Sequence, residues 1–133
     1  MNLLIFATCK PFIGDDAWRQ EQAIRSWKNI KSDKYNIKIV LIGKDDGVKE
    51  ICEKYNLIHY HDVKTLQGVP YVWDLFNIVL GLSESKNDKF IWTNADMIYY
   101  DEMIENLLIA EKSFEKEPFS LYLKVHHPQN KYQ

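Results

Sequence analysis

Two short polar segments carry the residue types with the clearest chemistry. Asp45-Asp46-Gly47 follows one predicted strand, and Asn94-Ala95-Asp96 follows another. Carboxylates at the ends of parallel strands can accept hydrogen bonds from ribose hydroxyls and can hold a divalent cation against a diphosphate. In extended chain residues i and i+2 point to the same side, so Asn94 and Asp96 are predicted to face one ligand. Each segment also has a plain structural interpretation, with Asp46 as a helix cap and Asn94 to Asp96 as a polar turn.

The elements that must position these segments alternate between strands and helices. Short apolar runs predict strands buried on both faces, and apolar residues at spacings of three and four predict helices. The predicted strands cover residues 3–7, 37–42, 57–60, 90–93 and 119–125, and the predicted helices cover residues 15–30, 48–55 and 70–83 and a segment capped by Asp101. The helix over 70–83 is apolar around most of its circumference, so it is predicted to be the most buried helix.

The order of these elements predicts the fold class. A βαβαβαβαβ succession favours a three-layer α/β/α domain with a mostly parallel, twisted sheet of about five strands. Ligands of such sheets bind beyond the carboxyl ends of the strands, where the strand order reverses. The 133 residues are enough for one domain, so residues 1–133 are predicted to form a single unit.

Composition excludes several classes of function. The 17 basic and 19 acidic residues give a net charge of −2, which implies no bulk attraction to nucleic acid or to an anionic membrane. No apolar run is long enough for a membrane span, and two cysteines form no disulfide framework, so we expect a soluble, cytoplasmic protein. Neither a dinucleotide-binding glycine motif nor a phosphate loop follows the first strand.

Four pieces of the chain, in order, resemble the nucleotide-sugar-binding half of a GT-A-type glycosyltransferase. The likeness is to small bacterial and viral enzymes related to family 2, and it covers nearly the whole chain. The pieces are Arg19-Gln20 with Ala23-Ile24 and Ser26-Trp27, then residues 42–48, then Gly68-Val69-Pro70 with Asp74-Leu75-Phe76, and finally residues 93–98. Asn94-Ala95-Asp96 is similar to the Asp-x-Asp motif of that superfamily.

The resemblance implies a nucleotide-diphospho-sugar as donor and Mn²⁺ or Mg²⁺ as cofactor. It places Asp96 on the metal, with Asn94 in the position of the first acid, and an amide there removes one negative charge. The other implied roles are Thr8 and Asp45 or Asp46 at the base and ribose, Gly68 at a close approach of backbone to ligand, and Asp74 near the sugar or diphosphate. Lys10 or Arg25 could stabilise the leaving group.

The predicted reaction is transfer of the sugar to an unknown acceptor, and no catalytic base is identifiable. In the resembled enzymes the base lies in an acceptor-binding half, which is absent or minimal here, so a homodimer or a second chain could supply it. The alternative is a non-catalytic module of the same fold that binds a nucleotide-sugar or a partner. A receiver-like or flavodoxin-like domain is disfavoured, because the first strand ends in Thr8-Cys9 rather than in acids.

Several other side chains could bind a metal ion or a ligand. His59 and His61 alternate on a strand and could chelate a metal with Asp62, although a solvent-facing position is preferred. His126-His127 could reach the ligand from the last strand. Trp27, Trp73 and Trp92 are predicted to be core residues, whereas Trp18, Tyr99 and Tyr100 are candidates for stacking on a base or sugar. Cys9 is predicted to be a small packing residue, and Gln20 is predicted to face water.

Overall fold

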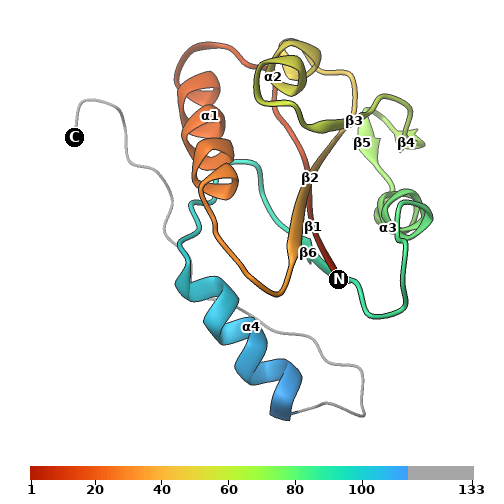
Figure 1. Ribbon diagram of the computed structural model, residues 1–133. Coiled ribbons are helices and arrows are strands. Elements are labelled where there is room, and N and C mark those ends of the chain that lie inside the picture. The colour runs from red at the N-terminus through yellow and green to blue at the C-terminus, as the bar shows by residue number, and fades with distance from the viewer. Residues whose placement is uncertain (114–133) are drawn as a thin grey trace.

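A parallel four-stranded sheet forms the centre of the computed structural model, which describes residues 1–113 (Figure 1). The strand order is β3-β2-β1-β6. These strands are β1 (Asn2–Thr8), β2 (Asn36–Ile42), β3 (Ile58–Tyr60) and β6 (Lys89–Trp92), and the helices are α1 (Gly14–Lys28), α2 (Val48–Tyr55), α3 (Val72–Gly81) and α4 (Glu102–Ser113). The predicted α/β class with a parallel sheet is confirmed. The predicted strand over 119–125 and His126-His127 lie outside the described residues.

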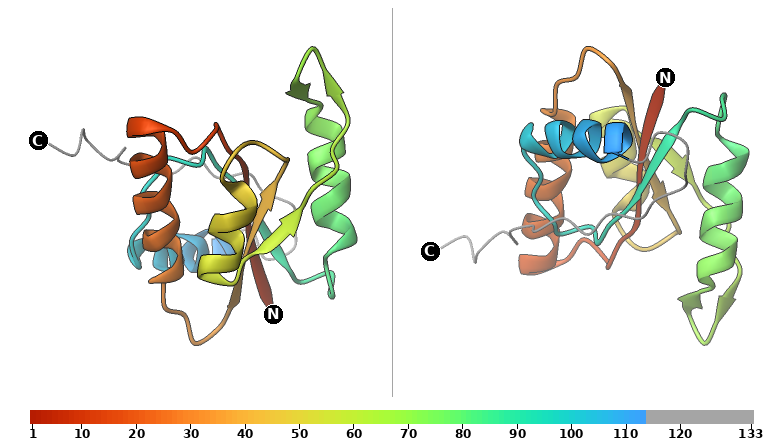
Figure 2. Two further views of the ribbon diagram at one scale, coloured as in Figure 1. Left: turned by 90° about the horizontal axis from the view of Figure 1, so that it is seen from above. Right: turned by 90° about the horizontal axis from the view of Figure 1, so that it is seen from below.

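Helices cover both faces of the sheet (Figure 2). Alternate residues of β1 point to opposite faces, so Leu3 and Ile5 pack with α1, α2 and α4, while Leu4 and Phe6 pack with α3. The chain runs from β1 outward through β2 to β3 and then returns to place β6 on the other side of β1. The strand order therefore reverses at the carboxyl ends of β1 and β6.

The helix predicted to be most buried is only half covered. Leu75 and Val79 of α3 are 3% and 1% exposed against the sheet, whereas Trp73 and Leu80 are 51% and 56% exposed. The prediction was wrong because α3 packs alone on its face, so one side of it meets the strands and the other side has no cover within residues 1–113. Trp92 of β6 lies on the same face and is also 51% exposed, so the core assignment holds for Trp27 but not for Trp73 or Trp92.

A short antiparallel hairpin between β3 and α3 was not predicted. It pairs β4 (Thr65–Leu66) with β5 (Val69–Pro70), and Gln67 and Gly68 take positive φ values of 51° and 81° at its turn. Pro70 therefore ends the hairpin and does not begin the helix, which starts at Val72. No helix of the described part of the chain is long and apolar enough to cross a membrane.

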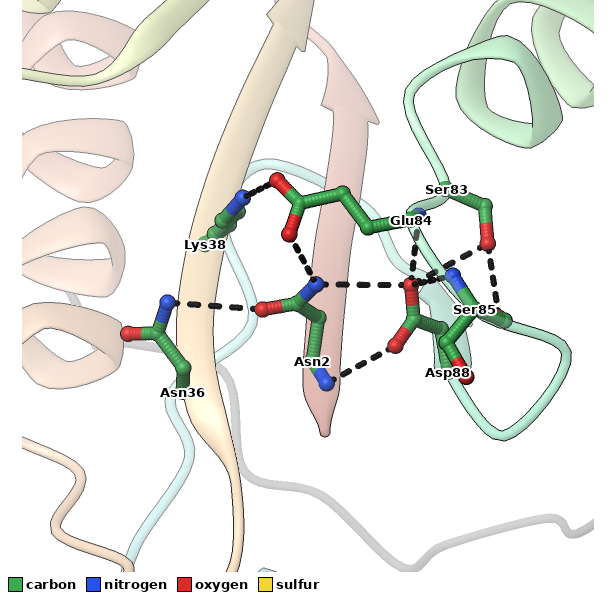
Figure 3. A network of polar contacts seen from close by, with 7 residues as sticks. All are labelled: Asn2, Asn36, Lys38, Ser83, Glu84, Ser85 and Asp88. Atoms are coloured by element: carbon green, nitrogen blue, oxygen red, sulfur yellow. Dashed lines mark hydrogen bonds and ion pairs between the residues drawn. The ribbon is translucent and has the colours of Figure 1, made fainter.

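The amino-terminal edge of the sheet is tied together by the carboxylate of Asp88 (Figure 3). It accepts hydrogen bonds from the backbone N–H of Asn2 at 2.9 Å and from that of Glu84 at 2.9 Å. The hydrogen bond from the Asn2 backbone is the main reason that the pKa of Asp88 lies well below its usual range. The Lys38 ammonium group of β2 donates to the Glu84 carboxylate at 2.7 Å. The loop before β6 is therefore fixed to both β1 and β2.

Candidate functional site

A pocket of about 730 Å³ opens at the carboxyl ends of the strands. Its walls are the segments that follow β1, β2 and β3, together with the β4–β5 hairpin and the first turn of α3. The structure brings five of the predicted site residues into this lining, namely Thr8, Lys10, Asp45, Gly68 and Asp74. Five of the nine residues predicted from the sequence thus share one pocket at the carboxyl edge of the sheet.

The pocket lining carries charges of both signs, with three lysines and three aspartates. The Asp74 carboxylate accepts a hydrogen bond from the backbone N–H of Lys64 at 2.7 Å, and the Asp62 carboxylate lies 3.0 Å from the imidazole of His61. Neither Lys10 nor Lys44 forms an ion pair with any other residue of 1–113. Their ammonium groups line the pocket and can donate to phosphate oxygens.

The loop that carries Lys10 is held by a buried glutamine. Gln20 is 3% exposed, and its Nε2 donates to the Lys10 carbonyl at 2.9 Å while its Oε1 accepts from the Lys10 N–H at 2.7 Å. The prediction that Gln20 faces water was wrong. The missed signal is its position in the stripe with Ala23, Ile24 and Trp27, where a polar residue on a buried face needs partners.

The loop after β2 is joined to the loop after β1. The backbone N–H of Phe12 donates to the Asp46 carbonyl at 2.8 Å, and a Cβ on Gly47 would lie 2.6 Å from the Phe12 Cβ. Gly47 also has a φ of 87° and is the N-cap residue of α2, so Asp46 does not cap that helix. Asp46 is exposed and is not part of the pocket lining, in contrast to the predicted contact with base or ribose.

His59 secures the same loop from the other side. Its Nε2 lies 2.7 Å from the carbonyl oxygen of Gly43, so this nitrogen carries the proton and donates. His61 lies on the same side of β3, with its ring 6.0 Å from that of His59, and lines the pocket. Within residues 1–113 no group of three His, Cys, Asp or Glu side chains is arranged to hold a metal ion.

The Asn94-Ala95-Asp96 segment is a turn and not an extended strand end. Strand β6 ends at Trp92, and the backbone N–H of Met97 donates to the Asn94 carbonyl at 3.3 Å. The expectation that Asn94 and Asp96 share one side of a strand was therefore wrong. Ala95 is buried, whereas Asn94 is exposed and Asp96 is partly exposed, so the turn presents its two polar residues away from the core.

Helix α1 and a buried tyrosine hold this turn in place. The indole Nε1 of Trp27 donates to the Met97 carbonyl at 2.7 Å, and the Tyr99 hydroxyl donates to Thr93 Oγ1 at 2.7 Å. Tyr99 is 9% exposed and is thus not available for stacking, whereas Tyr100 is 59% exposed. The backbone N–H of Thr93 donates to the Phe6 carbonyl at 3.1 Å, so the turn follows the strand beside β1. It lies outside the pocket lining, on the opposite side of β1 from β2.

Arg25 does not join the site. It is exposed on α1, and its positive charge contributes to lowering the pKa of Glu21. The larger causes of that shift are the hydrogen bonds that Glu21 accepts from Lys54 and from the Tyr55 hydroxyl, both at 2.6 Å. Arg25 is therefore part of a charged cluster between α1 and α2.

Cys9 lines the pocket but is not a nucleophile. Burial, with the nearby Cys52 and Asp45 as smaller causes, raises the pKa of its thiol to about 12. The thiol is protonated at neutral pH, and the interpretation of Cys9 as a packing residue agrees with this.

Comparison with known protein families finds no match, and no curated protein and no solved structure shows significant similarity to the chain.

Proposed function

We propose that this domain binds a nucleotide-diphospho-sugar at the carboxyl edge of its sheet, as the nucleotide-binding domain of a GT-A-type glycosyltransferase, and transfers the sugar to an acceptor. The observation that carries the proposal is the arrangement around β1. The pocket with Lys10 and Lys44 lies on one side of its carboxyl end, and the Asn94-to-Asp96 turn lies on the other. The reversal of strand order at β1 and β6 supports a ligand at this place.

Residues of the pocket supply complementary partners for such a ligand. Lys10 and Lys44 would donate to the diphosphate, and the exposed Asp45 carboxylate would accept hydrogen bonds from ribose hydroxyls. The Gln20 clamp supports this role for Lys10 because it fixes the backbone on which the ammonium group is carried. Gly68 has a φ of 81°, which favours glycine, and a Cβ at this position would meet no other atom within 4 Å.

Asn94 and Asp96 fit a divalent cation in part. One amide oxygen and one carboxylate from a rigid turn are hard oxygen donors of the kind that Mg²⁺ and Mn²⁺ accept, and Mg²⁺ is commonly held by one or two carboxylates together with substrate phosphates. Two protein ligands alone would bind the ion weakly. A cation held there would neutralise charge on the diphosphate leaving group.

In the proposed reaction an acceptor hydroxyl attacks the anomeric carbon, and the bond from that carbon to the nucleoside diphosphate breaks. The acceptor proton passes to a base, which we do not assign to a residue. A second candidate function is binding of the nucleotide-sugar without transfer. Two observations favour it: the amide of Asn94 stands where the resembled enzymes carry an acid, and the Asp74 carboxylate is already engaged by the Lys64 backbone.

Calorimetric titration with UDP-, GDP- and CDP-sugars, with and without Mn²⁺, tests the proposal. We expect one of them to bind, and we expect Lys44→Ala to weaken binding about tenfold through loss of a charged hydrogen bond. Lys49→Ala, at an exposed position on α2, is the matched control and should bind like the wild type. Asp96→Ala should remove the Mn²⁺ dependence, whereas Asp33→Ala, in the loop between α1 and β2, should preserve it.

Absence of binding to all three donor classes would overturn the proposal. Binding with no loss of donor across a screen of sugar acceptors would favour the binding module over the transferase.

A further inference from the structure

An exposed aromatic pair lies where the hairpin meets α3. The rings of Tyr71 and Trp73 have centroids 5.7 Å apart and planes 31° apart. Tyr71 is 37% exposed and Trp73 is 51% exposed, although both are large and mostly apolar. Exposed aromatic side chains that are held close to each other are typical of binding surfaces.

The pair is fixed to the rim of the pocket by Lys64. The backbone N–H of Tyr71 donates to the Lys64 carbonyl at 2.9 Å, and the Lys64 N–H donates to the Asp74 carboxylate at 2.7 Å. The Lys64 ammonium group lies 5.1 Å from the centre of the Trp73 ring. Lys64 and Asp74 line the pocket, whereas the two rings do not, so the pair lies next to residues of the pocket wall.

Packing against the sheet does not explain these rings. Phe76, one turn further along α3, makes edge-to-face contacts with Phe6 at 5.4 Å and with Trp92 at 5.7 Å and so covers the sheet. Within residues 1–113 the Tyr71 ring has a ring contact with Trp73 alone. The Trp73 ring has one further partner, the ammonium group of Lys64. The two rings are therefore exposed beside Lys64, where a ligand can reach them.

The polar groups beside the rings indicate the chemistry of that ligand. His61 and Asp62 have side chains that are 60% and 93% exposed, and with Lys64 they line the adjoining wall of the pocket. A purely apolar partner that covered this region would remove these polar side chains from water, which is costly. A sugar ring has C–H faces that stack on aromatic rings and hydroxyls that bond to carboxylate, imidazole and ammonium groups.

We propose that Tyr71 and Trp73 form a saccharide subsite at the rim of the pocket. Its occupant is an acceptor sugar, and this assignment as acceptor rests on the proposed function. The subsite would place the hydroxyls of the acceptor beside the pocket in which the donor is proposed to bind.

Saturation-transfer NMR and tryptophan fluorescence titration with maltotriose, cellotriose and chitotriose test the subsite. We expect the wild type to bind one of these and Trp73→Ala to lose at least tenfold in affinity. Trp92→Ala is the matched control, because Trp92 has the same 51% exposure on the same face but its ring packs against Phe76, whereas that of Trp73 lies beside Lys64. This variant should bind within twofold of the wild type. Tyr71→Ala provides a second variant, and circular dichroism checks the fold of each.

Lack of binding by the wild type to all three saccharides, or equal losses in Trp73→Ala and Trp92→Ala, would overturn the subsite. A shift from dimer to monomer in both tryptophan variants, measured by size-exclusion chromatography, would also overturn it and assign the face to a second copy of the chain. Titration of the same variants with the nucleotide-sugar separates the two proposals. We expect Trp73→Ala to bind the nucleotide-sugar like the wild type. If the wild type binds a saccharide but no nucleotide-sugar, the saccharide subsite is supported and the proposed donor site is overturned.

Discussion

Replacement of Gln20 by leucine tests how the pocket is built. Leucine has a similar size but neither donates nor accepts, so the N–H and the carbonyl of Lys10 both lose their partner. Each unsatisfied buried group costs about 1–3 kcal/mol, and because the Lys10 side of the contact is open to water we expect a total of about 2–3 kcal/mol. Urea unfolding followed by the fluorescence of buried Trp27 measures this loss.

The matched control is Gln22→Leu, which makes the same chemical change two residues further along α1. No hydrogen bond of the Gln22 side chain is recorded within residues 1–113, so we expect a change within about 0.5 kcal/mol. Equal effects of the two substitutions would refute the assignment of Gln20 as a clamp. Lys10 should also become mobile in Gln20→Leu, so nucleotide-sugar affinity should fall together with stability.

Gln20→Glu gives the same contact a pH dependence. The introduced carboxyl group faces the Lys10 carbonyl, to which only its protonated form can donate, so its folded pKa should lie above the unfolded value of about 4.3. The contribution of the contact is then fully present below the unfolded pKa and is lost as pH rises through the folded pKa. The difference in urea midpoint from the wild type should widen between pH 4 and pH 8, and a constant difference would contradict the reasoning.

Three further predictions concern positions outside this clamp. Gly47→Ala should destabilise the fold more than Gly14→Ala. Both sites have a positive φ, which costs an alanine about 1–2 kcal/mol, but only at Gly47 does the added Cβ also clash with Phe12, at about 1–3 kcal/mol. Equal urea midpoints of the two variants would exclude the clash. Asp88→Asn should lower the free energy of unfolding at pH 7. Because the native pKa of Asp88 is depressed, the difference from the wild type should shrink as pH falls below about 4. A difference that stays constant in acid would contradict this prediction. Cys9 should react with iodoacetamide at pH 8 much more slowly than in urea-unfolded protein, and comparable rates measured by mass spectrometry would contradict its burial.

The parts of the fold that depend on local pattern could be predicted from the sequence. The apolar runs of β1 and β2 are buried on both faces, and the stripe of Ala23, Ile24 and Trp27 faces the sheet. Five of the predicted site residues share one pocket because parallel strands place their carboxyl ends together. Neither inference requires knowledge of which distant segments meet.

The parts that depend on distant contacts could not be predicted. A helix that is apolar all round, such as α3, does not reveal which side meets the sheet or how many neighbours cover it, so the exposure of Trp73 was missed. The sequence leaves Asn94 to Asp96 open between a strand end and a polar turn; the structure has the turn, and Trp27 holds it by donating to the Met97 carbonyl, 70 residues away. Arg25 was assigned to the site by its charge, although its helix directs it toward Glu21.

The position of β1 in the sheet has a consequence for the order in which the fold can assemble. Residues Leu3 to Ala7 are at most 1% exposed, yet one neighbour of β1 begins at Asn36 and the other at Lys89. During synthesis β1 is made before both of these neighbours, and one of its edges stays unpaired until β6 leaves the ribosome. In that interval its unpaired N–H and carbonyl groups can pair with another chain. One edge of β1 thus stays open to pairing with another chain from the making of β2 until the making of β6.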